Sequence, residues 1–123
     1  MNLQAHDPIA LQQLLRQRRE AHCQALWQEV ARLTQEAIAL GVQRIILFGS
    51  LVWGSPGLTS DVDVLLVWET PLGFLERTAE VYRRLQPQVA VDLFVYTPNE
   101  LTRLADTPLI RRVLAEGRVL YAA

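Results

Sequence analysis

Residues 44–68 read RIILFGSLVWGSPGLTSDVDVLLVW, and this stretch decides the fold. Two apolar segments, 44–48 and 62–68, have the length and the composition of buried strands. The segment between them, 49–60, is rich in glycine and serine, which predicts a loop, and it contains a short apolar turn at 51–53. Because this loop is short, we expect the two strands to pair antiparallel.

Helical patterns precede and follow these strands in the sequence. Between residues 8 and 40, apolar residues recur every three or four positions, with Asp7 as the N-terminal cap and Gly41 as the C-terminal stop. The rest of the chain predicts, in order, a helix, a strand, one or two short helices and an edge strand, at residues 71–85, 89–96, 98–116 (interrupted at Pro108) and 119–121. The helix between the second and third strands is a crossover, which predicts that these strands are parallel. The fold class is therefore a small α/β (α+β) domain, with helices packed on a mixed sheet.

The length of the chain indicates a single domain spanning residues 1–123. An unbroken helix over residues 8–40 would be about 50 Å long, whereas a domain of this size is roughly 35 Å across. We therefore expect the extension at residues 1–25 either to break near 16–20 and fold back, or to project. In the first case Leu11, Leu14 and Leu15 join the core, and in the second they form a surface for a partner or for a second copy.

The composition excludes several classes of function. All 12 basic residues are arginine, and the absence of lysine excludes a Walker A phosphate loop and Schiff-base chemistry. A formal charge of -1 argues against strong, non-specific nucleic-acid binding. The single cysteine, Cys23, and the two histidines, His6 and His22, are too few for a disulfide framework, a zinc cluster or a Ser-His-Asp hydrolase, and we assign them no function. Since no apolar run is long enough to span a membrane and no signal peptide is present, we expect a cytoplasmic protein.

Three of the five aspartates occupy positions that folding alone does not favour. Asp61 and Asp63 are two residues apart at the start of the second strand, so both side chains project from one face. Two neighbouring carboxylates repel and raise each other's pKa. Either water solvates this pair at the strand end, or a divalent metal neutralises it.

Asp92 interrupts the otherwise apolar third strand, 89–96. An unpaired carboxylate in a buried strand is strongly unfavourable, so we expect Asp92 to have a partner. That partner is either an arginine such as Arg44 or Arg83, or the metal bound by Asp61 and Asp63. Three carboxylates around two Mg²⁺ are typical of nucleotidyl and phosphoryl transfer.

Gly49 and Ser50 follow the first strand directly. A glycine lets the backbone approach a ligand closely. If a helix begins at the apolar turn, its free N–H groups and the Ser50 hydroxyl form an anion site. The alternative is a loop without function.

Taken in order, Gly49-Ser50, ten further residues, Asp61-x-Asp63 and the later strand aspartate Asp92 resemble the signature of the nucleotidyltransferase superfamily. The resemblance covers about residues 44–96. The short chain is similar to the minimal nucleotidyltransferases, especially the antitoxin of HEPN/MNT toxin–antitoxin pairs. The resemblance implies that Gly49 and Ser50 bind the phosphates of ATP. It further implies that Asp61, Asp63 and Asp92 are catalytic and bind two Mg²⁺ ions.

The same resemblance implies a protein adenylyltransferase that transfers AMP from ATP to a tyrosine of a partner HEPN ribonuclease toxin and so neutralises it. A second hypothesis is a non-catalytic antitoxin that blocks the toxin by contact through Leu11, Leu14 and Leu15. A third is a transferase subunit acting on a small molecule or a nucleic acid.

This chain departs from the family pattern after the Gly-Ser pair, where an arginine is common and Leu51-Val52-Trp53 stands instead. Trp53 either anchors the loop or stacks on a base or a partner. Three arginines of the 71–85 helix either form a solvated face or supply the missing charge; these are Arg77, Arg83 and Arg84.

Overall fold

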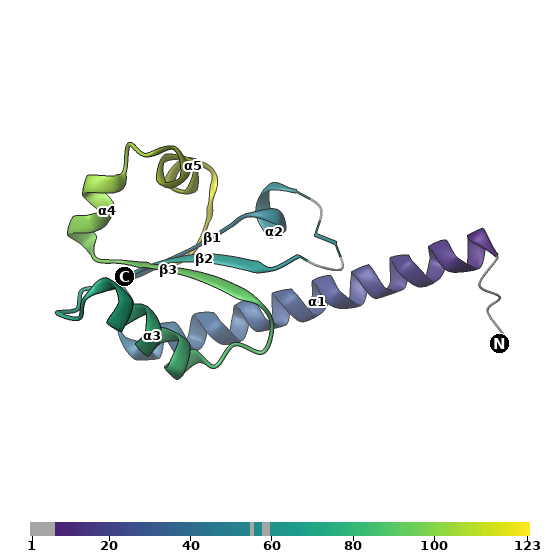
Figure 1. Ribbon diagram of the computed structural model, residues 1–123, viewed down its shortest axis with the longest axis horizontal. Helices are drawn as coiled ribbons and strands as arrows, with labels where there is room; N and C mark the ends of the chain where they lie inside the picture. Colours follow the sequence, from purple (N-terminus) through teal and green to yellow (C-terminus); the bar gives the residue numbers. More distant parts are fainter. Residues whose placement is uncertain (1–6, 55, 58–59) are drawn as a thin grey trace.

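A computed structural model describes residues 7–54, 56–57 and 60–123. Four strands form one sheet in the order β3-β2-β1-β4, with helices on both faces (Figure 1). The strands are β1 (Arg44–Phe48), β2 (Val62–Val67), β3 (Val91–Tyr96) and β4 (Arg118–Ala122). The helices are α1 (Pro8–Leu40), α2 (Ser50–Trp53), α3 (Phe74–Leu85), α4 (Pro98–Leu104) and α5 (Pro108–Glu116).

The predicted strand directions are confirmed. β1 pairs antiparallel with β2 and with β4, whereas β2 and β3 are parallel. The predicted mixed sheet and fold class are therefore confirmed as well. The register aligns Phe48 with Asp63, and Asp63 with Asp92. The end of β1 and the starts of β2 and β3 thus lie at one edge of the sheet.

α1 is a single unbroken helix of 33 residues. Asp7 caps its first turn by accepting hydrogen bonds from the backbone N–H groups of Ile9 and Ala10. Gly41 ends it in the left-handed conformation, with φ of 104°, which glycine adopts without strain. The predicted caps are confirmed, and the N-terminal part of this unbroken helix extends beyond the sheet (Figure 1).

The sheet has a separate hydrophobic layer on each face. On one face, α1 and α3 pack on alternate residues of the strands, including Val62, Val64 and Leu66 of β2. On the other face, α4 and α5 pack on the residues in between, including Leu65 and Val67. Because side chains alternate along a strand, Asp63 and Asp92 point to the α4–α5 face.

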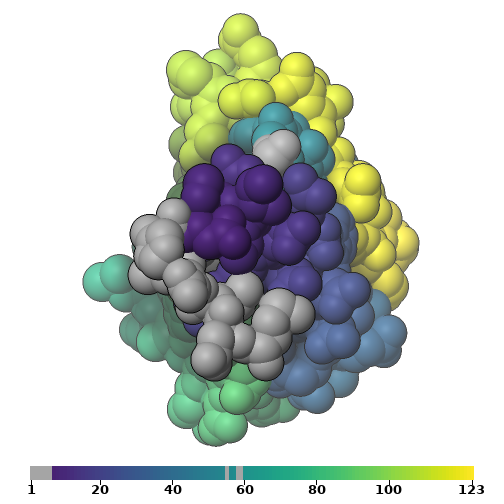
Figure 2. All heavy atoms as spheres, turned by 90° about the vertical axis from the view of Figure 1, so that its right-hand side faces the viewer, coloured from purple at the N-terminus to yellow at the C-terminus, as the bar shows by residue number. Residues whose placement is uncertain are grey.

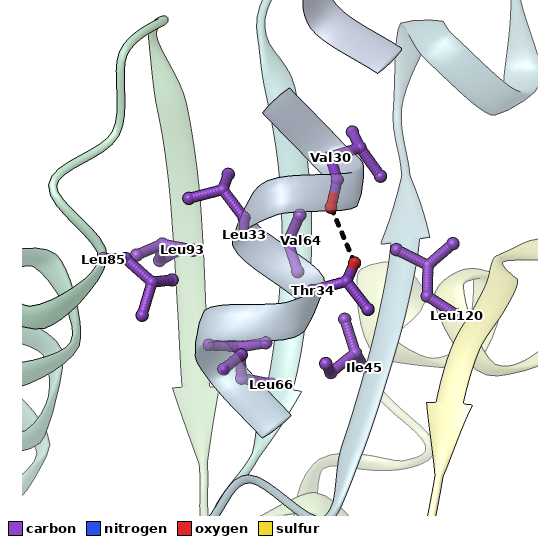
Figure 3. Close-up of a pocket in the computed structure, with 10 residues that line it drawn as sticks. Val30, Leu33, Thr34, Ile45, Val64, Leu66, Leu85, Leu93 and Leu120 are labelled. Atoms are coloured by element: carbon purple, nitrogen blue, oxygen red, sulfur yellow. Dashed lines mark hydrogen bonds between the residues drawn. The ribbon is translucent and has the colours of Figure 1, made fainter. Parts of the chain in front are cut away.

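Between α1 and the sheet the packing is nearly complete. Figure 3 shows the side chains of α1 facing those of the strands around a void of about 10 Å³. That volume is at the lower limit for a single water molecule. The lining is apolar side chains apart from Thr34, whose hydroxyl donates to the carbonyl of Val30 at 2.7 Å. The contact between α1 and the sheet is therefore part of the hydrophobic core.

An ion pair between the buried Glu29 and the half-exposed Arg32 fixes α1 against the end of α3. Glu29 accepts a hydrogen bond from Arg32 Nε at 2.6 Å and another from the backbone N–H of Gln88. Arg32 Nη2 also donates to the carbonyls of Leu85 and Gln86, each at 3.0 Å. These bonds keep the pKa of the Glu29 carboxyl below its usual value, chiefly through Arg32. The orientation of α1 on the sheet is therefore set by polar as well as apolar contacts.

Two predicted elements begin later in the chain than expected. The helix expected at 71–85 begins at Phe74, because Pro71 and Leu72 form a bend before it. The strand expected at 89–96 begins at Val91, because Val89 lies in a bend. The interruption predicted at Pro108 separates α4 from α5, and the predicted edge strand is β4.

Candidate active site

The candidate site stands at the edge of the sheet where β1 ends and where β2 and β3 begin. Gly49 follows β1 directly and precedes α2, so that Ser50 is the first residue of this short helix. The carbonyl of Gly49 accepts from the N–H groups of Val52 and Trp53 at 3.0 and 2.8 Å. The first N–H groups of a helix have no partner within it and remain available to an anion. The structure thus forms the helical turn predicted after Gly49.

Glycine is the only residue type that fits at position 49. Its backbone has φ of 81° and ψ of -154°, a region that other residues avoid. A Cβ atom added here would lie 2.1 Å from Asp63 Oδ2. The backbone of Gly49 therefore packs directly against the Asp63 carboxylate. This contact places the Gly-Ser turn next to one of the three candidate aspartates.

Asp63 and Asp92 lie side by side on the parallel strands β2 and β3. The pKa of the Asp63 carboxyl is raised from 3.8 to about 6, first by burial, then by the charge of Asp92 and the contact with its carboxylate, and last by Asp61. The predicted repulsion between neighbouring carboxylates therefore acts on Asp63. Its main charged neighbour is Asp92, across the strands, rather than Asp61, along the chain.

The surroundings of Asp92 differ from those predicted. Asp92 is exposed, because it is the second residue of an edge strand whose burial alternates. It is not a carboxylate inside a buried strand, so its position does not require an arginine. The alternative partner Arg83 is instead bound to Glu80 at 2.6 Å. Within the described residues, Asp92 forms no ion pair with Arg44 either.

All five ion pairs found within residues 7–54, 56–57 and 60–123 use a glutamate. None of them neutralises Asp61, Asp63 or Asp92. Carboxylate oxygens are the ligands that Mg²⁺ prefers, and a divalent cation would relieve the repulsion that raises the pKa of Asp63. The chemistry of the donor set therefore fits a divalent metal.

The three carboxylates do not, however, form a ready metal cluster. In the described part of the chain no group of three or more histidine, cysteine, aspartate or glutamate side chains is arranged to hold a metal ion. The side chains of Asp63 and Asp92 are in contact, whereas Asp61 is exposed and precedes β2 by one residue. The assignment of Asp61, Asp63 and Asp92 as metal ligands, and of Gly49 and Ser50 as phosphate ligands, stays a prediction.

Trp53 links the Gly-Ser turn to α5. Its indole Nε1–H donates to the carbonyl of Glu116 at 3.1 Å, and the Arg112 guanidinium lies 3.9 Å from the centre of its ring. Its ring also lies 5.7 Å from that of Phe48 at the end of β1. Of the two interpretations of Trp53, these contacts favour the loop anchor. The sequence indicated an anchor but carried no sign that α5 would supply its partner.

The three arginines of α3 fall into two groups. Arg83 and Arg84 are exposed and paired with Glu80, so they lie on the expected solvated face. Arg77 is buried, which neither alternative predicted. Its guanidinium binds Glu100 of α4 and donates to the carbonyls of Leu72 and Val95 at 3.1 and 3.3 Å. Arg77 is therefore a structural link between α3, β3 and α4.

The histidines and the cysteine were assigned no function from the sequence. His22 Nε2 lies 3.0 Å from the carbonyl oxygen of Ser60, so α1 contacts the chain just before Asp61. Cys23 is a half-buried free thiol. His6 lies outside the described residues. Over the described part of the chain, no helix has the length and apolarity to cross a membrane.

A family model for the nucleotidyltransferase domain matches residues 23–121. The chain belongs to this family. The match includes the Gly-Ser turn and all three candidate aspartates, and it begins after the projecting part of α1. A search of curated proteins and a search of solved structures each found no significant match. Family membership supports nucleotidyl transfer in general, and such domains use a nucleoside triphosphate and a divalent metal.

Proposed function

We propose that this nucleotidyltransferase-family protein is a Mg²⁺-dependent protein adenylyltransferase acting as an antitoxin. It transfers AMP from ATP to a tyrosine of a HEPN ribonuclease toxin in the cytoplasm. The proposal is supported chiefly by the contact between Gly49 and Asp63, which lies beside Asp92 at one edge of the sheet. Membership of the nucleotidyltransferase family supports it as well. The identity of the toxin class rests on the sequence resemblance.

The residues of the site divide the work between phosphate and metal. The turn at Gly49 and Ser50 offers N–H groups and a hydroxyl to the triphosphate. The chain has no lysine that could bind the phosphates instead. Asp61, Asp63 and Asp92 are the residues that would hold two Mg²⁺ ions, which supply positive charge for the triphosphate when bound. Because Gly49 packs against Asp63, the turn that would bind phosphate lies next to the carboxylates that would bind metal.

In the proposed reaction, the tyrosine oxygen forms a bond with the α-phosphorus of ATP. The bond between that phosphorus and the oxygen bridging to the β-phosphate breaks, and pyrophosphate leaves. The proton of the tyrosine passes to a carboxylate of the Asp63–Asp92 pair and then to solvent.

The test is co-expression with the candidate toxin, followed by the intact mass of the purified toxin. We expect the mass of one or more AMP groups on a toxin tyrosine. The adduct is lost with Asp63→Asn and kept with Gly57→Ala, a change in the same loop at a position with nothing within 4 Å. An unmodified toxin that is still neutralised by Asp63→Asn would contradict the enzymatic proposal.

A second candidate is an antitoxin that binds its toxin without chemistry. It is favoured by the absence of an arginine in the turn, where Leu51, Val52 and Trp53 stand, and by the exposed leucines of α1. This candidate predicts that Asp63→Asn neutralises the toxin as well as the wild type does. It also predicts that no AMP is found on the toxin.

A further inference from the structure

The first half of α1 extends beyond the domain at the edge that carries the candidate site. The C-terminal end of α1 leads into the start of β1, so its N-terminal end points towards the end of β1, where Gly49 lies. The contact of His22 with Ser60 marks the point where α1 passes this edge. Residues 8–21 continue past it for about 21 Å at 1.5 Å per residue. This segment lies at the right of Figure 1. Figure 2, viewed from that side, shows this segment in front of the rest of the molecule.

This overhang, residues 8–21, has apolar side chains without a covering partner in the described chain. The buried residues of α1 begin only at Leu26. In the overhang, Ile9 is 67% exposed, Leu11 45% and Leu15 37%. Leu11 and Leu15 are one turn apart, so their side chains form a continuous apolar strip. Covering this strip with another molecule would remove its apolar area from water, which is favourable.

The overhang is also basic, although the whole chain has a formal charge of -1. It carries Arg16, Arg18 and Arg19 against a single acidic residue, Glu20. Within the described residues, none of these four side chains takes part in an ion pair. Their charges are therefore available to an acidic partner.

A second copy of the chain fits this surface poorly. Two overhangs packed together would share a strip about 21 Å long and roughly 10 Å wide, whereas a stable interface buries about 800 Å² on each partner. Pairing would also bring two sets of arginines together. A nucleic acid would use the arginines but leave the leucines exposed to water, since phosphates and apolar side chains do not attract each other. A protein with an apolar, acidic face satisfies both features, and it gains further area if it also covers the site.

We propose that the overhang is the docking surface for the protein acceptor, which presents an amphipathic, acidic helix to Leu11, Leu15, Arg18 and Arg19. This proposal rests on the proposed function for the chemistry of the acceptor and adds the surface that selects it. The helix of the acceptor lies along the overhang, and the hydroxyl to be modified reaches the edge of the sheet beside Asp63 and Asp92. The family match begins at residue 23, after the overhang, so the overhang adds acceptor selection to the matched domain.

The experiment places a photo-crosslinking amino acid at Gln12, an exposed residue of the overhang, in the full chain expressed in its own cells. The crosslinked material is treated with nuclease or protease, and the joined peptide is sequenced. One test variant combines Leu11→Ser with Leu15→Ser, and a second carries Arg18→Glu. The matched controls are Leu109→Ser, at a leucine that is 44% exposed on α5, and Arg103→Glu on α4.

We expect an adduct to a different protein, through a peptide with an apolar stripe and an excess of Asp and Glu. Each test variant lowers the yield at least tenfold, and each control leaves it unchanged. An adduct to a second copy, an adduct to nucleic acid, a non-acidic peptide, no adduct, or equal loss in the controls would overturn the docking proposal. The mass of the captured protein separates the two proposals. The expected adduct without AMP leaves docking intact and contradicts transfer, whereas an AMP-modified acceptor captured equally by all variants contradicts docking alone.

Discussion

Replacing Asp63 by asparagine is expected to stabilise the metal-free protein while it abolishes nucleotide chemistry. The pKa of Asp63 is raised from 3.8 to about 6 by burial and by its carboxylate neighbours. At 1.36 kcal/mol per unit, a rise of this size corresponds to about 3 kcal/mol of unfavourable free energy for the ionised form. Because the site is partly open to solvent, we discount this to about 1–2 kcal/mol.

The pH dependence of this effect has a defined sign. Well below pH 3.8 the Asp63 carboxyl is protonated in the folded and in the unfolded chain, so the group costs nothing. As the pH rises from 3.8 to about 6, the unfolded chain ionises first, and the folded state loses stability. Above this window the full penalty remains. Asparagine does not titrate, so the stability advantage of Asp63→Asn should appear across this window and stay constant above it.

The assay is urea unfolding in EDTA at pH 4, 5, 6 and 7, for the wild type, Asp63→Asn and Asp106→Asn. The last variant alters an exposed aspartate away from the site. We expect Asp63→Asn to exceed the wild type by about 1–2 kcal/mol at pH 7 and by little at pH 4, with no such trend for Asp106→Asn. The account of the carboxylate pair would be refuted by an advantage that does not change with pH, or by an Asp63→Asn variant less stable than the wild type at pH 7.

Three further predictions concern packing at Gly49, Arg77 and Trp53. Gly49→Ala should lower the free energy of unfolding by about 2–4 kcal/mol because of its positive φ and the clash with Asp63, whereas Gly57→Ala should change it by less than about 0.5 kcal/mol; equal losses in urea unfolding would argue against this reasoning. Arg77→Met should cost about 2–4 kcal/mol and leave the affinity for ATP unchanged, and a selective loss of affinity in a stable variant would show instead that Arg77 serves the nucleotide. Trp53→Phe removes one hydrogen bond and should cost about 1 kcal/mol, whereas Trp53→Ala also removes the stack on Arg112 and should cost about 2–3 kcal/mol; thermal unfolding that ranks the two variants in the opposite order would contradict the anchor.

The pattern of apolar residues was sufficient to predict most of the fold. The strands at 44–48 and near 62–68, the caps at Asp7 and Gly41, and the parallel and antiparallel pairings depend on local periodicity and on loop length, which the sequence states directly. The start of α3 was misplaced because Pro71 resembles a helix start, whereas Gly73 is the residue before the helix.

The surroundings of single charged residues were harder to predict. The exposure of Asp92 depends on β3 lying at the edge of the sheet, and the burial of Arg77 depends on Glu100, which is 23 residues further along the chain. The anchoring of Trp53 depends on Glu116, which is 63 residues away. Such partners come together only through tertiary packing, and no local pattern indicates them.

The spacing in the sequence predicted that the Gly-Ser turn and the aspartates share a site, but it did not predict which of them are in contact. Ten residues separate Ser50 from Asp61 in the sequence, and the structure places the backbone of Gly49 against Asp63. The spacing indicated a shared site. Only the register, Phe48 with Asp63 and Asp63 with Asp92, shows which carboxylates lie next to the turn.

Titration calorimetry of ATP, with and without Mg²⁺, tests directly whether Gly49, Ser50 and the three aspartates form a metal-dependent nucleotide site. We predict binding of ATP that requires Mg²⁺ and that is weakened at least tenfold by Asp63→Asn and by Asp92→Asn, while Asp106→Asn binds like the wild type. Binding without metal, or metal-dependent binding that survives both site variants, would contradict the account.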